Sequence, residues 1–177
     1  MTEPTLTAHD LIAWVDKTST GWRNLLTQHP ELLALPCNIM GVQTVAQLLQ
    51  HIVAVEPRYA QRLADQPATE YADIPFDSVE SIYSTHDRAI ALLRQLLAAD
   101  IDWDASIEFT TRSMGPARSR RRTILFHSLL HSIRHYAQLA TLVRQSGVKP
   151  DWPMDYFFMD IQFSDLIPNA PQTVSPK

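Results

Sequence analysis

The chain has 177 residues, the size of one ordinary domain, and its 45% apolar and 19% charged residues suffice for a folded core. Its net charge of −4 disfavours a nucleic-acid-binding protein, because such domains are usually basic. Only four glycines occur and they lie far apart, which excludes glycine-rich dinucleotide and P-loop sites and argues against an all-β fold.

The single cysteine, Cys37, excludes an intramolecular disulfide and a cysteine-rich zinc site, so any metal would need histidine or carboxylate ligands. The sequence shows no basic leader followed by an apolar run, and no apolar stretch of about 18 residues. We therefore expect a cytoplasmic protein without a membrane partner.

Four proline-poor segments carry apolar residues at the spacing of an amphipathic helix. They cover about 7–28, 42–64, 77–99 and 119–146. In the second segment, Pro57 is expected to kink the helix or to mark a local break in it. The third begins with Asp77 and Glu80, which resemble a capping box, and the fourth ends at Gly147, placed at the C′ position. Four long amphipathic helices in one domain predict an all-α fold, a four-helix bundle.

The segment 101–117, before the fourth helix, is long enough to join two helices that are not antiparallel neighbours. Ile107, Phe109 and Thr111 alternate with polar residues within it. We expect either a short strand pair or an ordered loop there.

The end of the chain is expected to lie outside the four helices. Residues 151–160 could form a short helix that caps the domain. We assign the domain to residues 1–163 and expect a disordered, proline-rich tail at 164–177.

The fourth segment contains three histidines at four-residue spacing, His127, His131 and His135. Neighbouring members lie about 40° apart on one helix face, so two of these imidazoles can share one metal ion. The outer two differ by about 80°, so all three could bind one ion only with strain. A pair of ligands from this helix is therefore the better interpretation.

Two ligands are too few for a stable site, and His51, in the middle of the second segment, is a third candidate. Its neighbours are apolar, and a histidine in such surroundings needs a partner. A bundle could set His51 opposite the fourth helix, which would give three imidazoles and an open position, the pattern of catalytic zinc. The alternative is that the histidines are solvent-facing or core-edge residues. We expect His9 and His29 at the surface, and His86 to be incidental or to line the same cavity.

Two motifs resemble the DinB-like superfamily of damage-inducible proteins, which are four-helix metal-binding bundles. One is TVAQLLQHIVAVE at 44–56, which contains a single histidine. The other is HSIRHYAQ at 131–138, which is similar to the family's H-x3-H-R-G-Q signature. The resemblance covers about residues 8–147.

The resemblance assigns the metal ligands to one histidine of the second helix and two of the fourth, namely His51, His131 and His135. Gln138 matches the signature glutamine and would lie near the metal, and His127 lies one turn outside the ligand triad. The sequence departs from the signature at Tyr136 and Ala137, which stand where the family has arginine and glycine. The small Ala137 still permits close helix packing, whereas the role of the missing arginine is open.

The resemblance also implies an up-down-down-up bundle, a divalent metal that is often zinc or nickel, and a homodimer. Some characterised relatives are bacillithiol S-transferases and mycothiol-dependent maleylpyruvate isomerases, in which the metal is thought to bind and activate a small thiol. Many members have no known reaction. The resemblance therefore predicts the site better than the substrate.

Several other residues could contribute to such a site. Arg58 lies seven residues after His51 and would share its face but for Pro57, so it could bind the carboxylate of a thiol; a solvated arginine is the alternative. Tyr136 could donate to an oxyanion, although nothing distinguishes it from other tyrosines. Glu56 lies about 140° round the helix from His51, so a surface or capping role is favoured over a contact with an imidazole.

The only dense basic cluster is RSRRR at 118–122, at the expected start of the fourth helix. Arginine there opposes the helix macrodipole, so it should serve a local purpose. The first candidate partners are acidic residues of the segment 100–108, followed by an anionic ligand and last by nucleic acid.

We hypothesise a divalent-metal-dependent enzyme resembling thiol S-transferases, in which the metal activates a thiol or water for attack on an electrophile. The partners would be a small-molecule thiol and the electrophile. The first alternative is a non-catalytic metal-binding protein related to stress. The second is a helical interaction module with structural histidines.

Overall fold

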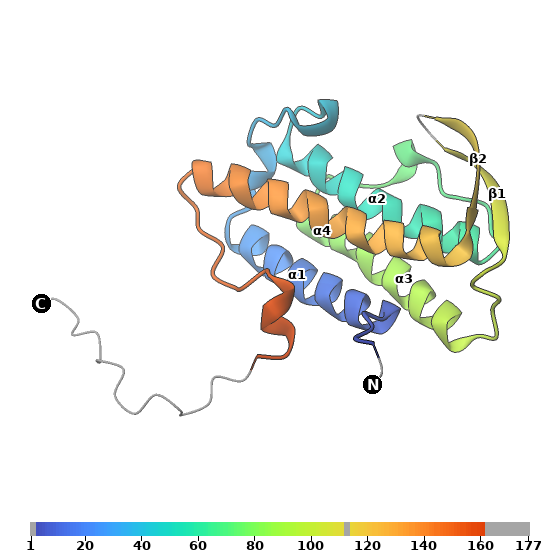
Figure 1. The fold of residues 1–177 in the computed structure, drawn as a ribbon. Helices are drawn as coiled ribbons and strands as arrows, with labels where there is room; N and C mark the ends of the chain where they lie inside the picture. The colour runs from blue at the N-terminus through green and yellow to red at the C-terminus, as the bar shows by residue number, and fades with distance from the viewer. Residues whose placement is uncertain (1–2, 112–113, 162–177) are drawn as a thin grey trace, which may run out of the picture.

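The computed structural model describes residues 3–111 and 114–161. Within these residues, the helices of the bundle are α1 (Ala8–Gln28), α2 (Val45–Leu63), α3 (Val79–Ala98) and α4 (Arg121–Gln145). Two antiparallel strands, β1 (Ser106–Thr111) and β2 (Gly115–Arg120), form a hairpin between α3 and α4. The predicted four-helix bundle is confirmed (Figure 1).

The helices have the up-down-down-up order. In Figure 1, α1 and α4 run in one direction, and α2 and α3 run in the other. The main helix contacts are those of α2 with α3 and α4, and those of α1 with the same two helices. Because α2 packs against two neighbours, more than one of its faces lies inside the protein.

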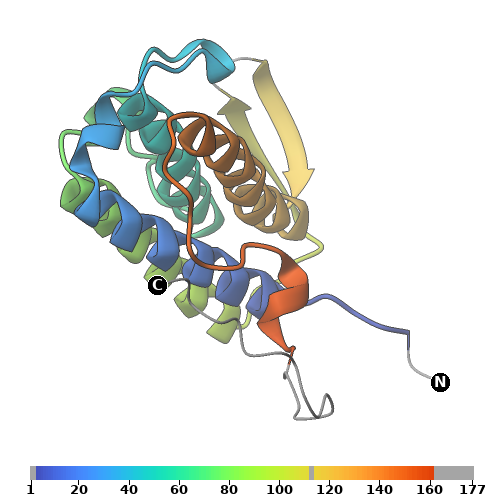
Figure 2. The same cartoon turned by 90° about the vertical axis from the view of Figure 1, so that its left-hand side faces the viewer.

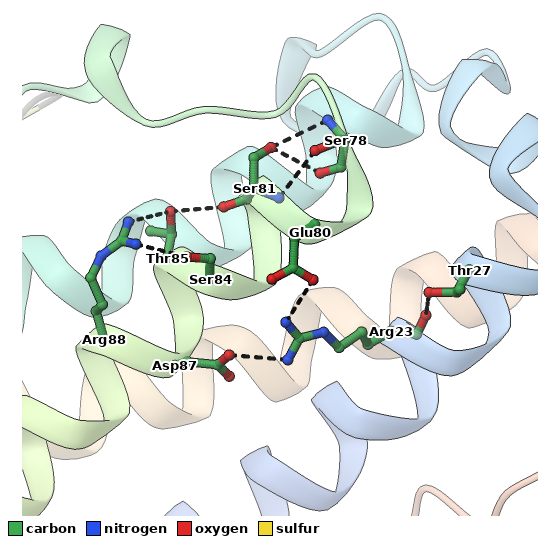
Figure 3. A network of polar contacts seen from close by, with 9 residues as sticks. All are labelled: Arg23, Thr27, Ser78, Glu80, Ser81, Ser84, Thr85, Asp87 and Arg88. Carbon is green, nitrogen blue, oxygen red and sulfur yellow. Dashed lines mark hydrogen bonds and ion pairs between the residues drawn. The ribbon is translucent and has the colours of Figure 1, made fainter.

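Side-chain caps fix the starts of three helices. Thr7 and Asp10 form a capping box at α1, and the Thr44 side chain accepts a hydrogen bond from the Gln47 N–H at α2. The capping box of α3 is formed by Ser78 and Ser81, not by Asp77 and Glu80 as predicted. Figure 3 shows that Glu80 instead accepts a hydrogen bond from Arg23 of α1, which also binds Asp87 of α3. The wrong prediction arose because several adjacent polar residues can each serve as a cap.

The helix α2 continues through Pro57 as far as Leu63. Pro57 is itself buried and removes one backbone N–H donor, yet the residues after it remain in the same helix. This continuity matters for the site, because it keeps Arg58 and Arg62 on the helix that carries His51.

The segment before α4 forms the strand pair, the first of the two predicted alternatives. Because residues 115–120 belong to β2, α4 begins at Arg121 rather than near Ser119. Arg120 and Arg122 lie 3.8 and 3.1 Å from the Asp104 carboxylate, as expected for acidic partners in segment 100–108. The arginine cluster is therefore neutralised in part by the protein itself.

The segment after α4 lies along α1 (Figure 2). Its residues Tyr156–Met159 form a short 3-10 helix, so the expected short C-terminal helix is present. Trp14 Nε1 donates a 2.7 Å hydrogen bond to the Met154 carbonyl, and Trp152 packs edge-on against buried Trp22. The expected tail at 164–177 lies outside the described residues.

None of the helices in the described part of the chain combines the length and the apolar character needed to cross a membrane.

Candidate metal centre

The bundle brings together three histidines that are far apart in sequence. His51 lies in the middle of α2, and His131 and His135 lie one turn apart on α4, which packs against α2. Each can offer one ring nitrogen such that all three nitrogens lie within 4.8 Å of one another. The ring centroids are 4.9 Å apart for His51 and His131, 4.8 Å for His51 and His135, and 4.4 Å for the α4 pair.

The surroundings keep the imidazoles of His131 and His135 neutral. Burial lowers the pKa of His131, and the neighbouring histidines and Arg134 lower it further, to about 3. Burial also lowers the pKa of His135, against the opposing effect of its hydrogen bond to Gln138. Neutral imidazole is the form that binds metal ions, so both rings are in the required state near neutral pH.

The hydrogen bonds of His135 select one tautomer. Its Nε2 lies 2.9 Å from an Arg134 guanidinium nitrogen, which can only donate, so Nε2 is the acceptor. Its Nδ1 therefore carries the proton and donates to Gln138 Oε1 at 2.6 Å. This arrangement resembles the outer hydrogen bond that holds metal-binding histidines in place.

The residues present fit a divalent metal ion. The Nδ1 atom of His131 is buried and has no hydrogen-bond partner among the described residues, although buried polar atoms usually have one. A metal ion held by the three imidazoles would give this buried atom a partner, and at His135 it would take the Nε2 lone pair that faces Arg134. Three nitrogen ligands without a thiolate suit zinc or nickel better than magnesium or calcium.

His127 lies beside the three-histidine cluster but is not part of it. Its ring is 5.7 Å from His131 and packs edge-on against Tyr59 at 5.3 Å. His127 is exposed, and it lines the same pocket as His51 and His131. The helical geometry that favoured a pair over a triplet on α4 agrees with this placement.

A pocket of about 310 Å³ opens beside the cluster. His51 and His131 line it, together with the positively charged Arg58 and Arg62 of α2. Arg58 therefore lines the same pocket as His51. Arg62 was not singled out from the sequence, although its position eleven residues after His51 places it on the same helical stripe.

Tyr136 does not line this pocket. It is 1% exposed, its hydroxyl lies 3.1 Å from that of Ser19 on α1, and its ring stacks on Trp22. The suggestion that Tyr136 binds substrate at the histidines is therefore not supported. Its place next to His135 in sequence turns it towards α1, because adjacent helical residues point about 100° apart.

The surface or capping role favoured for Glu56 is wrong. Glu56 is 0% exposed and accepts a 2.7 Å hydrogen bond from the Ser132 hydroxyl of α4. Its other carboxyl oxygen lies 2.7 Å from Nδ1 of His86 on α3. The angle from His51 was correct, but the face reached by that angle is covered by helices rather than by water.

His86 is likewise neither incidental nor part of the pocket wall. It is buried, and its Nε2 lies 3.4 Å from Asp16 of α1, which pairs with Arg94. A carboxyl group in the apolar stretch of α2 needs a buried partner. The position of Glu56 in that stretch was therefore the sign in the sequence that it pairs with another buried group.

Two comparisons with known proteins bear on the family of this chain. A search of the curated proteins finds no match to this chain. A sequence model of the DinB family matches residues 1–169, nearly the whole chain. The match and the three-histidine cluster together indicate a divalent-metal-binding protein. The chain belongs to the DinB family.

Proposed function

We propose that this protein is a divalent-metal-dependent enzyme of the thiol S-transferase type, with the metal bound by His51, His131 and His135. The observation that carries the proposal is the cluster of three imidazoles, two of which line a pocket. A structural metal site would be closed by a fourth protein ligand, whereas three ligands beside a cavity leave a position for a substrate.

When bound, the ion would lower the pKa of a thiol or water that occupies the open position and so favour the nucleophilic form. Gln138 Oε1 accepts a hydrogen bond from the Nδ1–H of His135, which fixes the orientation of that imidazole. Ala54 and Val55 supply apolar wall to the pocket, and Arg58 offers a cationic group to the substrate. We propose zinc or nickel as the native metal, because the ligands are all imidazoles.

Two further parts of the proposal concern the cell and the assembly. A reaction that consumes a reduced small thiol requires a reducing compartment, which supports the cytoplasm as the location. We also propose a homodimer, as the family resemblance implies. Sedimentation of the purified protein at several concentrations would test the dimer independently of the metal.

The first prediction concerns metal content. We expect purified protein to contain about one equivalent of zinc or nickel per chain, and His131→Ala to lose it, because two imidazoles bind too weakly. His127→Ala is the matched control on the same helix and should retain the metal. Elemental analysis by mass spectrometry gives the ratio. Protein that takes up no metal on titration and melts at the same temperature with and without zinc would instead be a helical interaction module.

Thiol consumption separates the enzyme from a non-catalytic metal-binding protein. Metal-loaded protein is mixed with a panel of small thiols and monochlorobimane, whose fluorescence reports conjugation. We expect at least one thiol to react faster than with the metal-free His51→Ala variant. Equal rates for every thiol and electrophile tried, with full metal occupancy, would leave the non-catalytic alternative in place.

A further inference from the structure

The pocket has a histidine end and an arginine end. His51, Val55, Arg58 and Arg62 follow one stripe of α2 and all line the pocket. His51 and Arg62 are eleven residues apart, which corresponds to about 16 Å along a helix axis. A small molecule could therefore touch both ends at once.

Protein contacts hold the two guanidinium groups in place. Arg62 donates a 3.0 Å hydrogen bond to the Thr110 carbonyl, and its Cζ lies 5.1 Å from the centre of the Tyr59 ring and 5.3 Å from that of Phe109. Arg58 donates to the Thr69 carbonyl. Each guanidinium has five N–H donors, so one carbonyl occupies only part of its binding capacity.

Neither arginine of this pair lies within ion-pair distance of a carboxylate in the part of the chain that the structure describes. Arg23, Arg94 and Arg121 form ion pairs with carboxylates, whereas neither Arg58 nor Arg62 does so within residues 3–111 and 114–161. The described lining of the pocket includes no aspartate or glutamate. Burial lowers the pKa of Arg62, and the nearby charge of Arg58 lowers it further, against the opposing effects of Tyr59 and Glu70. The two guanidinium groups therefore lie close enough to repel each other.

We propose that Arg58 and Arg62 form a subsite for the oxyanion, carboxylate or phosphate, of the small molecule whose other end reaches the histidine cluster. Paired guanidinium groups are suited to oxyanions, because their parallel N–H donors match two oxygen atoms. An anion between them would relieve the repulsion and would be attracted further by a bound divalent ion. The subsite rests on the proposed function for the chemistry at the histidine end, but anion binding itself does not require the metal.

A purely structural role is the competing explanation. In that case Arg58 and Arg62 would only anchor the segment around Thr69 and the hairpin strand β1. Such anchors would affect the melting temperature and would give no preference between a charged ligand and an uncharged ligand of the same length. The preference is therefore the quantity to measure.

The first experiment titrates the full chain, with and without zinc, with hexanoate, hexylphosphonate and hexanol, and follows the arginine Nε–Hε signals by NMR. We expect both anions to bind at least about tenfold more tightly than hexanol, as for a charge-assisted pair of hydrogen bonds. The signals of Arg58 and Arg62 should shift, and that of Arg88, outside this pocket, should not. Tighter binding of the phosphonate would identify a phosphate ligand, and tighter binding of hexanoate a carboxylate.

Arg58→Gln and Arg62→Gln should reduce the preference for the anion to near unity, and Arg88→Gln, which removes the same charge from α3, should preserve it. Equal binding of acid and alcohol to the native protein would overturn the proposal, as would a preference that survives both pocket variants. If either variant fails to fold, the arginine signals of the native protein still decide between the two explanations.

A second experiment keeps failure of the subsite separate from failure of the proposed function. Metal-loaded protein is titrated with 6-mercaptohexanoate and 6-mercaptohexanol. A preference for the acid that Arg62→Gln abolishes, at unchanged metal content, supports the subsite. Protein that takes up no zinc on titration but still prefers hexanoate would contradict the proposed function alone, whereas metal-loaded protein without a preference would contradict the subsite alone.

Discussion

The hydrogen bond from His135 to Gln138 determines which nitrogen of the imidazole keeps its lone pair. At 2.6 Å from Gln138 Oε1, the Nδ1 atom donates, and Nε2 remains the acceptor. Gln138 is exposed and adds little to the core, so its effect should be specific to the histidine. The bond also spans one helical turn, which makes it independent of how the helices pack.

A prediction at the residue scale follows from this hydrogen bond. Gln138→Leu removes the acceptor, allows the other tautomer and lets the ring turn, so zinc affinity should fall about 10- to 100-fold. Gln138→Glu, which retains an acceptor, should bind zinc at least as tightly as the native protein. Competition with a zinc-sensitive dye measures both. An unchanged affinity for Gln138→Leu would show that the glutamine does not orient the ligand.

At the same scale, helical spacing was enough to predict the histidine cluster but not the partner of Glu56. The four-residue interval of His131 and His135 and the position of Gln138 are local features of α4, and the isolated His51 is a local feature of α2. The surroundings of Glu56 depend on α3 and α4, whose positions around α2 cannot be read from the residues of α2. Spacing gives the direction of a side chain but not the neighbour in that direction.

At the scale of elements, Gly21 of α1 lies in close contact with Trp152 in the segment after α4. A Cβ added to Gly21 would lie 2.2 Å from Cε2 of Trp152, too close for any side chain. The tryptophan ring is rigid and packs against Trp22, so it cannot move aside without losing that contact. Glycine in the middle of a helix is unfavourable, and this contact explains why it occurs here.

Gly21→Ala is therefore expected to destabilise the protein by about 1–3 kcal/mol, as overpacking does, although alanine favours a helix by about 1 kcal/mol. Thermal unfolding measures the change. The control is the same substitution in a Trp152→Ala background, where the obstacle is gone and Gly21→Ala should be neutral or stabilising. Destabilisation of equal size in both backgrounds would show that Trp152 is not the cause.

The elements also differed in how well the sequence predicted them. The limits of α1 were predicted to within one residue from apolar residues at helical spacing, and the Thr7–Asp10 capping box fixes its start. The start of α4 was placed too early, because strand β2 leads directly into the helix and Arg120 makes no side-chain cap. A helix start without a capping side chain cannot be located from the sequence to the residue.

At the scale of the whole molecule, one buried polar chain joins all four helices. Asp16 of α1 contacts His86 of α3, His86 contacts Glu56 of α2, and Glu56 accepts a hydrogen bond from Ser132 of α4. Ser132 follows the candidate ligand His131 directly in sequence. The chain of contacts therefore sets the position of α4 against α2, on which the histidine cluster depends.

The pH dependence of stability tests this polar chain. Burial alone would lower the pKa of His86, but Glu56 and Asp16 outweigh it and raise the pKa to about 10. The unfolded chain releases this proton near the ordinary histidine pKa of 6.5, so between pH 6.5 and 10 the folded state holds a proton that the unfolded state has lost. Stability from His86 is thus complete below pH 6.5 and declines as the pH rises to about 10, by up to about 1.4 kcal/mol per pH unit.

The comparison that isolates this effect is His86→Gln, which can still donate a hydrogen bond to Glu56 but does not titrate. Urea unfolding of metal-free protein at a series of pH values should show the native protein more stable than the variant near pH 6, because only His86 brings a positive charge to the buried carboxylate. The difference should shrink steadily towards pH 10 as the native histidine loses its proton. A difference that stays constant from pH 6 to 10 would mean that His86 is neutral in the folded protein, and that Ser132 and the other neighbours of Glu56 suffice to hold the four helices together.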